Sequence, residues 1–184
     1  MFVKVCGLTR EADVDAALDA GADAVGFVLA ESPRQVTLAR ARQLVERVGH
    51  AAMTVAVVVD PTDDDVAHLS EFDGVQVHGH RPFVPRSLQC ICATDGAVAG
   101  YVDGDWVLVD HSRGRGVAPD WSALDLSSYN VPVIVAGGLT PYNVGDVIAA
   151  ARPYGVDVSS GVETQPGIKD AALVRRFVSN AKSA

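Results

Sequence analysis

Short apolar runs rich in β-branched residues alternate with stretches of helical periodicity along the whole chain. The apolar runs cover residues 2–6, 24–29, 54–59, 74–77, 88–93, 106–110, 131–136 and 156–159. Residues 54–59 are almost wholly β-branched, which is typical of a strand buried on both faces. Such alternation predicts a parallel α/β sheet, and eight repeats favour a closed (β/α)8 TIM barrel over an open sheet.

Helices are predicted between most of these runs, at residues 10–20, 38–48, from 60–62 onward, 121–126, 141–151 and 170–181. Thr9 is positioned to cap the first helix, and Pro141 to begin the helix at 141–151. Residues 81–87 contain two prolines and residues 94–104 are rich in glycine, so the helices after strands 4 and 5 are expected to be shortened or missing. These trimmed crossovers account for a length of 184 residues, and we expect residues 1–184 to form one barrel domain.

Composition narrows the class of protein. Apolar residues make up 48% of the chain and charged residues 21%, which indicates a globular fold. The net charge of −8 and the lack of a basic run disfavour nucleic-acid binding. The sequence has no candidate membrane span and no signal-peptide pattern, so we expect a cytoplasmic protein.

The three cysteines are Cys6, Cys90 and Cys92. An odd, low count argues against a disulfide framework, and no paired Cys or His motif suggests a zinc site. Cys90 and Cys92 are two residues apart in a predicted strand and therefore share one face of it. We interpret both as small core residues.

Polar or reactive residues follow most of the predicted strands, and in a barrel the carboxyl ends of all strands meet at one mouth. Each alone has an ordinary structural interpretation, such as a buried thiol, a turn-capping aspartate or an arginine covering apolar surface. Their convergence favours a functional site. The candidates are Cys6, Arg34, Asp60, His78, Asp110, Gly137, Gly138, Asp157, Ser159, Ser160 and Gly161.

Two of these loops predict a phosphate site. Gly137-Gly138 follows strand 7, and Ser159-Ser160-Gly161 follows strand 8. Barrels often bind phosphate with these two loops, because glycine lets backbone N–H groups approach the anion and serine hydroxyls add donors. The alternative is a pair of tight turns.

Cys6 and Asp110 end strands 1 and 6 and could act on one substrate as general base and general acid. A free thiol titrates at about 8.5, so Cys6 requires activation. Lys4 lies on the same face of its strand as Cys6. Its ammonium either stabilises the thiolate or pairs with a core carboxylate.

The chain resembles the phosphoribosylanthranilate isomerases of tryptophan biosynthesis. The matching stretches follow one another in the order of the family and span nearly the whole chain. The matching stretches are KVCGLT at 4–9, GADAVGF at 21–27, SPRQV at 32–36, VQVHG at 75–79, VAGGLTPYNV at 135–144, GVDVSSGVE at 155–163 and PGIKD at 166–170.

This resemblance implies an Amadori rearrangement of N-(5-phosphoribosyl)anthranilate, a phosphosugar, without cofactor or metal. The cysteine matching Cys6 serves as base and the aspartate matching Asp110 as acid. The resemblance also places Arg34 near the anthranilate carboxylate, His78 along the site and Asp157 near the ribose hydroxyls. It assigns phosphate to Gly137, Gly138, Ser159, Ser160 and Gly161, and leaves a monomer or a homodimer open.

The loop after strand 6 departs from the family pattern. Family members usually carry a longer loop with a Gly-Gly-Thr-Gly run, whereas residues 110–121 here read DHSRGRGVAPDW. We expect a shortened lid in which Arg113 and Arg115 add positive charge.

Two alternatives remain beside the isomerase. A bifunctional phosphosugar isomerase that also acts in histidine biosynthesis would carry an aspartate at the end of strand 1 and a second phosphate loop after strand 4. Cys6 and the loop at Gly79 argue against it. A non-catalytic phosphate-binding relic is disfavoured because both Cys6 and Asp110 are retained.

Overall fold

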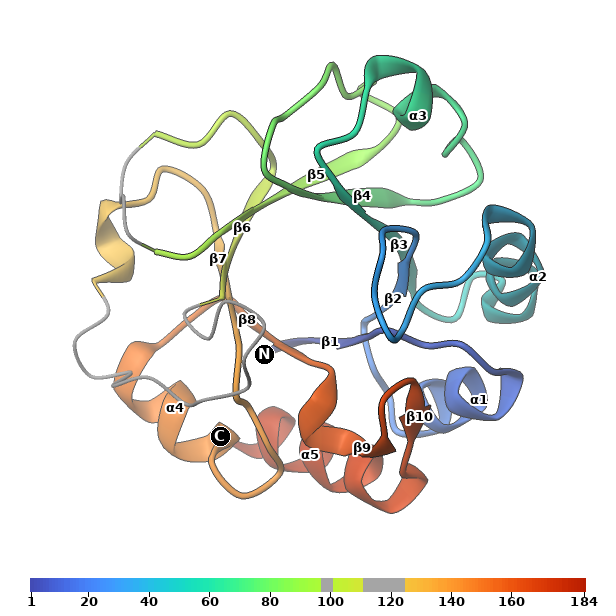
Figure 1. Ribbon diagram of the computed structural model, residues 1–184. Helices are drawn as coiled ribbons and strands as arrows, with labels where there is room; N and C mark the ends of the chain where they lie inside the picture. Colours follow the sequence, from blue (N-terminus) through green and yellow to red (C-terminus); the bar gives the residue numbers. More distant parts are fainter. Residues whose placement is uncertain (97–100, 111–124) are drawn as a thin grey trace.

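Parallel strands form a closed barrel in the computed structural model, which describes residues 1–96, 101–110 and 125–184. The strands follow one another around the barrel in chain order, and β8 closes against β1 (Figure 1). They are β1 (Phe2–Cys6), β2 (Ala24–Val28), β3 (Met53–Val59), β4 (Gly74–His78), β5 (Gln89–Thr94), β6 (Trp106–Asp110), β7 (Val133–Ala136) and β8 (Gly155–Val158). The predicted (β/α)8 fold class is confirmed.

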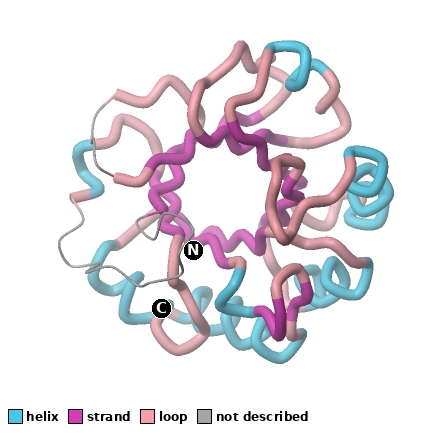
Figure 2. The backbone as a smooth tube through the Cα atoms, in the orientation of Figure 1, coloured by secondary structure: helices cyan, strands magenta, loops and turns pink. Residues whose placement is uncertain are grey.

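Helices pack around part of the barrel (Figure 2). They are α1 (Glu11–Asp19), α2 (Leu38–Val48), α3 (Asp63–Ala67), α4 (Val144–Ala151) and α5 (Ala171–Ser183), with 3₁₀ turns η2 (Leu126–Ser128) and η3 (Ser160–Val162). No helix lies in residues 79–88, nor in residues 95–96 and 101–105 of the next crossover. The predicted thinning after strands 4 and 5 is therefore confirmed for the described residues.

The alternation of side chains along each strand separates two cores. Inward-facing residues such as Ala24, Val55 and Ile91 fill the barrel, and outward-facing residues such as Val5 and Phe27 pack against the helices. Side chains along a strand alternate between the two faces with a period of two. The inward-facing residues that end β1, β4 and β6 therefore point toward the mouth of the barrel.

Several local predictions were wrong. Thr9 does not cap α1: Arg10 is the N-cap residue, and the Thr9 hydroxyl donates to the Gly167 carbonyl at 2.6 Å. Pro141 lies in a turn before α4, which begins at Val144, because residues 141–143 form that turn first. The helix predicted to open at residues 60–62 is present: α3 is five residues long, with Thr62 as its N-cap residue.

A short hairpin was also missed. β9 (Glu163–Gln165) and β10 (Ile168–Lys169) pair antiparallel in the segment interpreted as a loop. The hairpin turns at Gly167, whose φ of +80° suits glycine. Its three-residue and two-residue strands are too short to show an alternating pattern in the sequence.

Candidate active site

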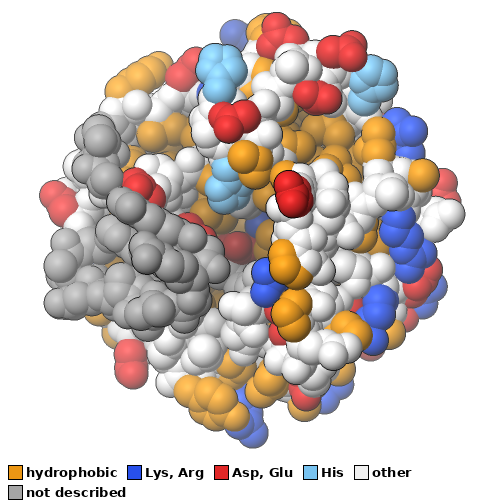
Figure 3. Space-filling model, in the orientation of Figure 1, with side chains coloured by type: hydrophobic (Ala, Val, Ile, Leu, Met, Phe, Trp, Pro, Cys, Tyr) orange, Lys and Arg blue, Asp and Glu red, His pale blue; other side chains and the backbone are white. Residues whose placement is uncertain are grey.

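A pocket of about 830 Å³ opens at the carboxyl ends of the strands. Figure 3 shows this face, with charged side chains inside the hollow. All but two of the candidate site residues line the pocket, and the exceptions are Asp60 and Gly161. The predicted lining residues are Cys6, Arg34, His78, Asp110, Gly137, Gly138, Asp157, Ser159 and Ser160.

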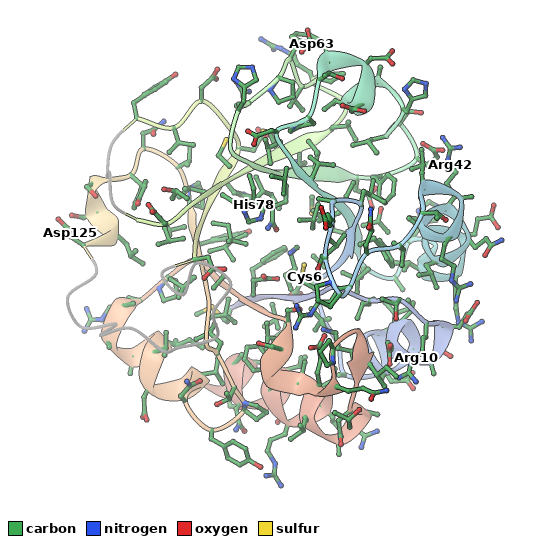
Figure 4. All side chains as sticks on the ribbon, viewed as in Figure 1. Cys6, Arg10, Arg42, Asp63, His78 and Asp125 are labelled. Carbon is green, nitrogen blue, oxygen red and sulfur yellow. The ribbon has the colours of Figure 1, made fainter. Side chains whose placement is uncertain are left out.

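Cys6 ends β1 and points into the barrel, as does His78 from β4 (Figure 4). A tight turn follows Cys6 at Gly7, whose φ is +75°. A Cβ at Gly7 would stand 2.6 Å from Cδ of Arg34, so glycine serves both the turn and the close approach of the arginine. Gly26 likewise leaves room, since a Cβ there would meet the Cys6 Sγ at 2.8 Å.

Burial raises the pKa of the Cys6 thiol, although the Lys4 ammonium beside it acts in the opposite direction. Lys4 Nζ donates to Asp157 Oδ1 at 2.9 Å, and the lysine side chain is completely buried. Both roles foreseen for Lys4 are therefore present: it pairs with a core carboxylate and it lies beside the thiol. The thiol stays largely protonated at neutral pH, because burial prevails over the ammonium.

Lys4 also determines the state of His78 through Gln76. Lys4 Nζ carries only donors, so the Gln76 atom 2.9 Å away is the amide oxygen. The amide nitrogen of Gln76 then faces His78 Nε2 at 2.7 Å and donates to it. His78 is consequently neutral with its proton on Nδ1. Burial and the charge of Lys4 lower the pKa of His78, which agrees with this tautomer.

Arg34 enters the pocket in a fixed orientation. Its Nε and Nη2 donate to the two carboxylate oxygens of Glu163 at 2.8 and 2.7 Å. Glu163 is almost buried, and it also accepts from Lys169 Nζ at 2.8 Å. Burial opposes the charged carboxylate, but Arg34 and Lys169 outweigh it and lower the pKa of Glu163. Sequence reasoning missed this support, and its only signal was the charge at 163 and 169 in a presumed loop.

Lys169 connects the arginine to the predicted phosphate loop. Its Nζ donates to the Ser159 carbonyl at 3.1 Å and lies 3.3 Å from the Ser159 hydroxyl. Burial lowers the pKa of Lys169, while Glu163 acts to raise it. A buried positive charge therefore stands behind Ser159, on the side away from solvent.

The loop after β7 is shaped for close approach of its backbone. Gly137 and Gly138 have φ values of +90° and +67°. Asn143 Nδ2 donates to the Gly138 carbonyl at 3.0 Å, which holds that oxygen within the loop. Gly161 lies in η3, where an added Cβ would collide with the backbone at Leu139. Glycine is therefore needed at position 161 because η3 packs closely on the neighbouring loop.

Asp110 ends β6 and lines the pocket from a strand that is not adjacent to β1. Arg113 and Arg115, the charges of the expected lid, lie outside the described residues. Asp60 does not line the pocket: its Oδ1 accepts from the His80 backbone N–H at 2.6 Å, which is the turn-capping role considered for it.

The described residues carry no group of three or more His, Cys, Asp or Glu side chains placed to hold a metal ion. In the same residues, no helix has the length and apolar character that a membrane crossing requires.

Comparison with known proteins identifies the family. The model of the family described as N-(5'phosphoribosyl)anthranilate (PRA) isomerase matches residues 3–180. The chain belongs to this family. N-(5'-phosphoribosyl)anthranilate isomerases from Pseudomonas fluorescens and Natronomonas pharaonis are 39% and 40% identical, over 95% and 97% of both chains.

Solved structures of the family share the fold. The Jonesia denitrificans protein TrpF superimposes with a TM-score of 0.86 at 36% identity, covering 100% of this chain and 97% of that one. A phosphoribosyl anthranilate isomerase in complex with reduced 1-(o-carboxyphenylamino)-1-deoxyribulose 5-phosphate gives 0.83 at 29% identity, covering all of both chains. The resemblance inferred from the sequence is confirmed.

Proposed function

We propose that this chain converts N-(5-phosphoribosyl)anthranilate to 1-(2-carboxyphenylamino)-1-deoxy-D-ribulose 5-phosphate in tryptophan biosynthesis. Membership of the isomerase family supports the reaction. The observation that carries the assignment is the single pocket that receives Cys6 and Asp110 from opposite parts of the barrel, with Arg34 and the loops after β7 and β8 on its rim. The complex of a related isomerase with a reduced product is consistent with it.

In the proposed reaction Asp110 is the acid and Cys6 the base. Asp110 donates a proton to the ribose ring oxygen as the C1–O bond breaks, and the anthranilate nitrogen forms an iminium with C1. Cys6 then removes the proton from C2, and the electrons of that C–H bond form the enolamine and neutralise the iminium. Tautomerisation gives the ketone. Each proton transfer contributes roughly 10²–10⁴-fold to the rate.

The iminium itself helps to activate the base. Burial disfavours the Cys6 thiolate, and Lys4 compensates for this only in part. A substrate cation beside the sulfur favours the thiolate in the same way as Lys4, and it is present only after the ring opens. The base is therefore strongest at the step that needs it.

The substrate groups fit the rest of the pocket. Arg34 offers a planar guanidinium, held by Glu163, to the anthranilate carboxylate. Gly137, Gly138, Ser159 and Ser160 surround the phosphate, with Lys169 behind Ser159. Asp157 and neutral His78 face the ribose end.

The test is turnover of freshly generated phosphoribosylanthranilate, followed by loss of anthranilate fluorescence. We expect Cys6→Ala and Asp110→Asn each to lower kcat at least about 100-fold. Calorimetry should show that both variants still bind the reduced product, since neither removes a binding group. Asp125→Asn, at an exposed turn far from the pocket, is the control and should keep full activity. Wild-type turnover no faster than the spontaneous reaction would refute the function, and an active Cys6→Ala would refute the base.

Four further features remain predictions. We propose that residues 1–184 form one domain, that the protein is cytoplasmic, that it binds no nucleic acid, and that it is a monomer or a homodimer. A related isomerase from Thermotoga maritima is described as dimeric, with engineered monomers. Sedimentation of this chain at several concentrations decides between the two states.

A further inference from the structure

Two cysteines lie on the outside of the barrel, away from the pocket. On β5 the inward positions belong to Ile91 and Ala93, which pack in the barrel interior. Cys90 and Cys92 therefore point outward, and neither lines the pocket. The interpretation of both as core residues holds for Cys90, which is 3% exposed, but Cys92 is only half-buried.

Among the described residues, loops rather than a helix cover this part of β5. Figure 1 shows the connection from β4 to β5 without a helix. Arg81 comes from the loop before β5, and Asp103 and Gly104 come from the crossover after it. The Gly104 backbone packs directly on the pair, because a Cβ there would stand 2.7 Å from the Cys92 sulfur. In the described part of these two crossovers, loop residues and no helix therefore cover the two thiols.

The geometry makes the two thiols one unit. Their sulfur atoms are 3.9 Å apart, within hydrogen-bond range for sulfur. The positive charge of Arg81 acts on the Cys90 sulfur, and Arg81 Nη1 pairs with Asp103 Oδ2 at 2.5 Å. Arg81 Nε is buried and has no hydrogen-bond partner in the described part of the chain. A cation with a donor still unused therefore stands beside the sulfurs.

The charges around the pair favour a single negative charge on it. A hydrogen bond from the Cys92 thiol and the Arg81 guanidinium lower the pKa of Cys90 to about 6, against burial and the charge of Asp105, whose carboxylate accepts from the Cys90 backbone N–H at 2.8 Å. The same hydrogen bond raises the pKa of Cys92, with burial and Asp103 acting in the same direction. The two sulfurs share one proton, so the pair titrates as a unit.

We propose that Cys90 and Cys92 form a second reactive site, a monoanionic dithiol on the outer face of β5 that is modified by hydroperoxides. The site is independent of the isomerase pocket. Cys92 provides access, since it is the more exposed sulfur. The negative charge lies mainly on Cys90, and transfer of the shared proton to Cys90 moves it to Cys92, a minor form that a small oxidant can reach.

The chemistry balances with the hydroperoxide as the oxidant. The thiolate attacks the terminal oxygen, an S–O bond forms as the O–O bond breaks, and the leaving alkoxide takes a proton from water. The sulfur is oxidised to a sulfenic acid and the peroxide is reduced to an alcohol, or to water from hydrogen peroxide. The new oxygen is an acceptor for the Arg81 guanidinium, which has an unused donor.

The product is a sulfenic acid rather than a disulfide. Alternate residues of a strand have Cα atoms about 6.6 Å apart, at the upper end of the range of about 4.4–6.8 Å that a disulfide spans. Closing the S–S bond would require β5 to bend while it is paired on both sides, with β4 and β6.

The first test is the pH dependence of alkylation by iodoacetamide, read by mass spectrometry of tryptic peptides. Cys90 and Cys92 share the peptide 87–113, whereas Cys6 is in peptide 5–10. We expect the alkylation rate of peptide 87–113 to be half-maximal near pH 6. The midpoint is the decisive quantity, because a thiolate of low pKa is also less nucleophilic and the rate at one pH changes little.

Variants separate the pair from an ordinary surface thiol. Arg81→Gln and Cys92→Ala should each move the midpoint above neutral pH. Arg86→Gln, at an exposed arginine of the same loop, should not; this variant lacks the tryptic site at 86, so its two thiols are read in peptide 48–113. All three should keep wild-type isomerase activity, because these residues do not line the pocket. A wild-type midpoint above about pH 8, the ordinary range of a thiol, overturns the proposal even if no variant folds.

The second test uses hydrogen peroxide followed by dimedone, which traps sulfenic acids. We expect the adduct on peptide 87–113 and not on peptide 5–10 at low peroxide. Equal labelling of both peptides, or labelling of the Cys6 peptide alone, would overturn the assignment. A two-hydrogen mass loss in peptide 87–113 without an adduct would contradict the sulfenic acid product.

Discussion

Replacing Lys4 with methionine tests the buried network that connects the barrel core to the active site. The Lys4 side chain is fully buried, and its partner carboxylate on Asp157 is 9% exposed at 2.9 Å. Methionine has a similar shape but no charge, so Asp157 loses its counter-ion and Gln76 loses a donor. The free energy of unfolding should therefore fall sharply.

Breaking a buried ion pair from one side costs about 3–5 kcal/mol, because the remaining charge is buried without compensation. Domains of this kind are stable by roughly 5–15 kcal/mol in total. At about 2–4 °C per kcal/mol for a chain of this size, the Tm should fall by roughly 10 °C. The loss is thus large enough to measure and small enough to leave a folded protein.

Urea unfolding at neutral pH, followed by circular dichroism, measures this loss. Lys182→Met is the matched control: Lys182 pairs with Asp23 at 2.5 Å, but both side chains are 36% exposed. An exposed pair contributes about 0–1 kcal/mol, so this variant should be nearly as stable as the wild type. Adding Asp157→Asn to Lys4→Met should restore part of the loss, since the uncompensated charge is gone.

Equal destabilisation by Lys4→Met and Lys182→Met would refute the reasoning, because burial would then make no difference. So would a further loss on adding Asp157→Asn to Lys4→Met. That outcome would mean that Asp157 stabilises the barrel by contacts other than its pairing with Lys4.

Other predictions address the pocket and its surroundings. Glu163→Gln should raise KM roughly 10-fold with little change in kcat, because Arg34 loses its charged bidentate partner; steady-state kinetics test this. The pKa of Glu163 is lower in the folded protein than in the unfolded chain, where it is near 4.5. Ionised Glu163 therefore stabilises the fold above pH 4.5, and this contribution is lost as the pH falls through the pKa of the folded state. The free energy of unfolding, measured in urea at decreasing pH, should therefore decline less steeply for Glu163→Gln than for the wild type. Gly7→Ala should lower the free energy of unfolding by about 1–3 kcal/mol, because the φ of +75° is unfavourable for alanine and the nearby Arg34 leaves no room for a Cβ. Thr62→Ala should cost about 1 kcal/mol by removing the cap of α3, as thermal unfolding will show.

Local patterns in the sequence were sufficient for the barrel and for most of its mouth. A buried parallel strand needs a continuous run of β-branched residues, and such a run is visible in residues 54–59 without any partner. Because strand ends converge in any closed barrel, the order of strands alone brings Cys6, His78 and Asp110 to one pocket. Prolines in 81–87 and glycines in 94–104 likewise indicated the missing helices.

Which partner each charge takes was decided only by the tertiary structure. Nothing near Lys4 in the sequence points to Asp157, Gln76 or the tautomer of His78, since these contacts join residues brought together by closure of the barrel. The pairing of Arg34 with Glu163 depends in the same way on a hairpin too short to have a sequence pattern.

The two outer cysteines also show what the sequence determines and what only the tertiary structure determines. Their spacing predicts a shared face of β5, but it leaves open which face that is and what covers it. In the barrel Ile91 faces inward, so Cys90 and Cys92 face outward, and the connections before and after β5 place Arg81 and Asp103 beside them. Alternation along a strand is a local property, whereas burial and charge at a side chain are set by whatever the rest of the chain brings next to it.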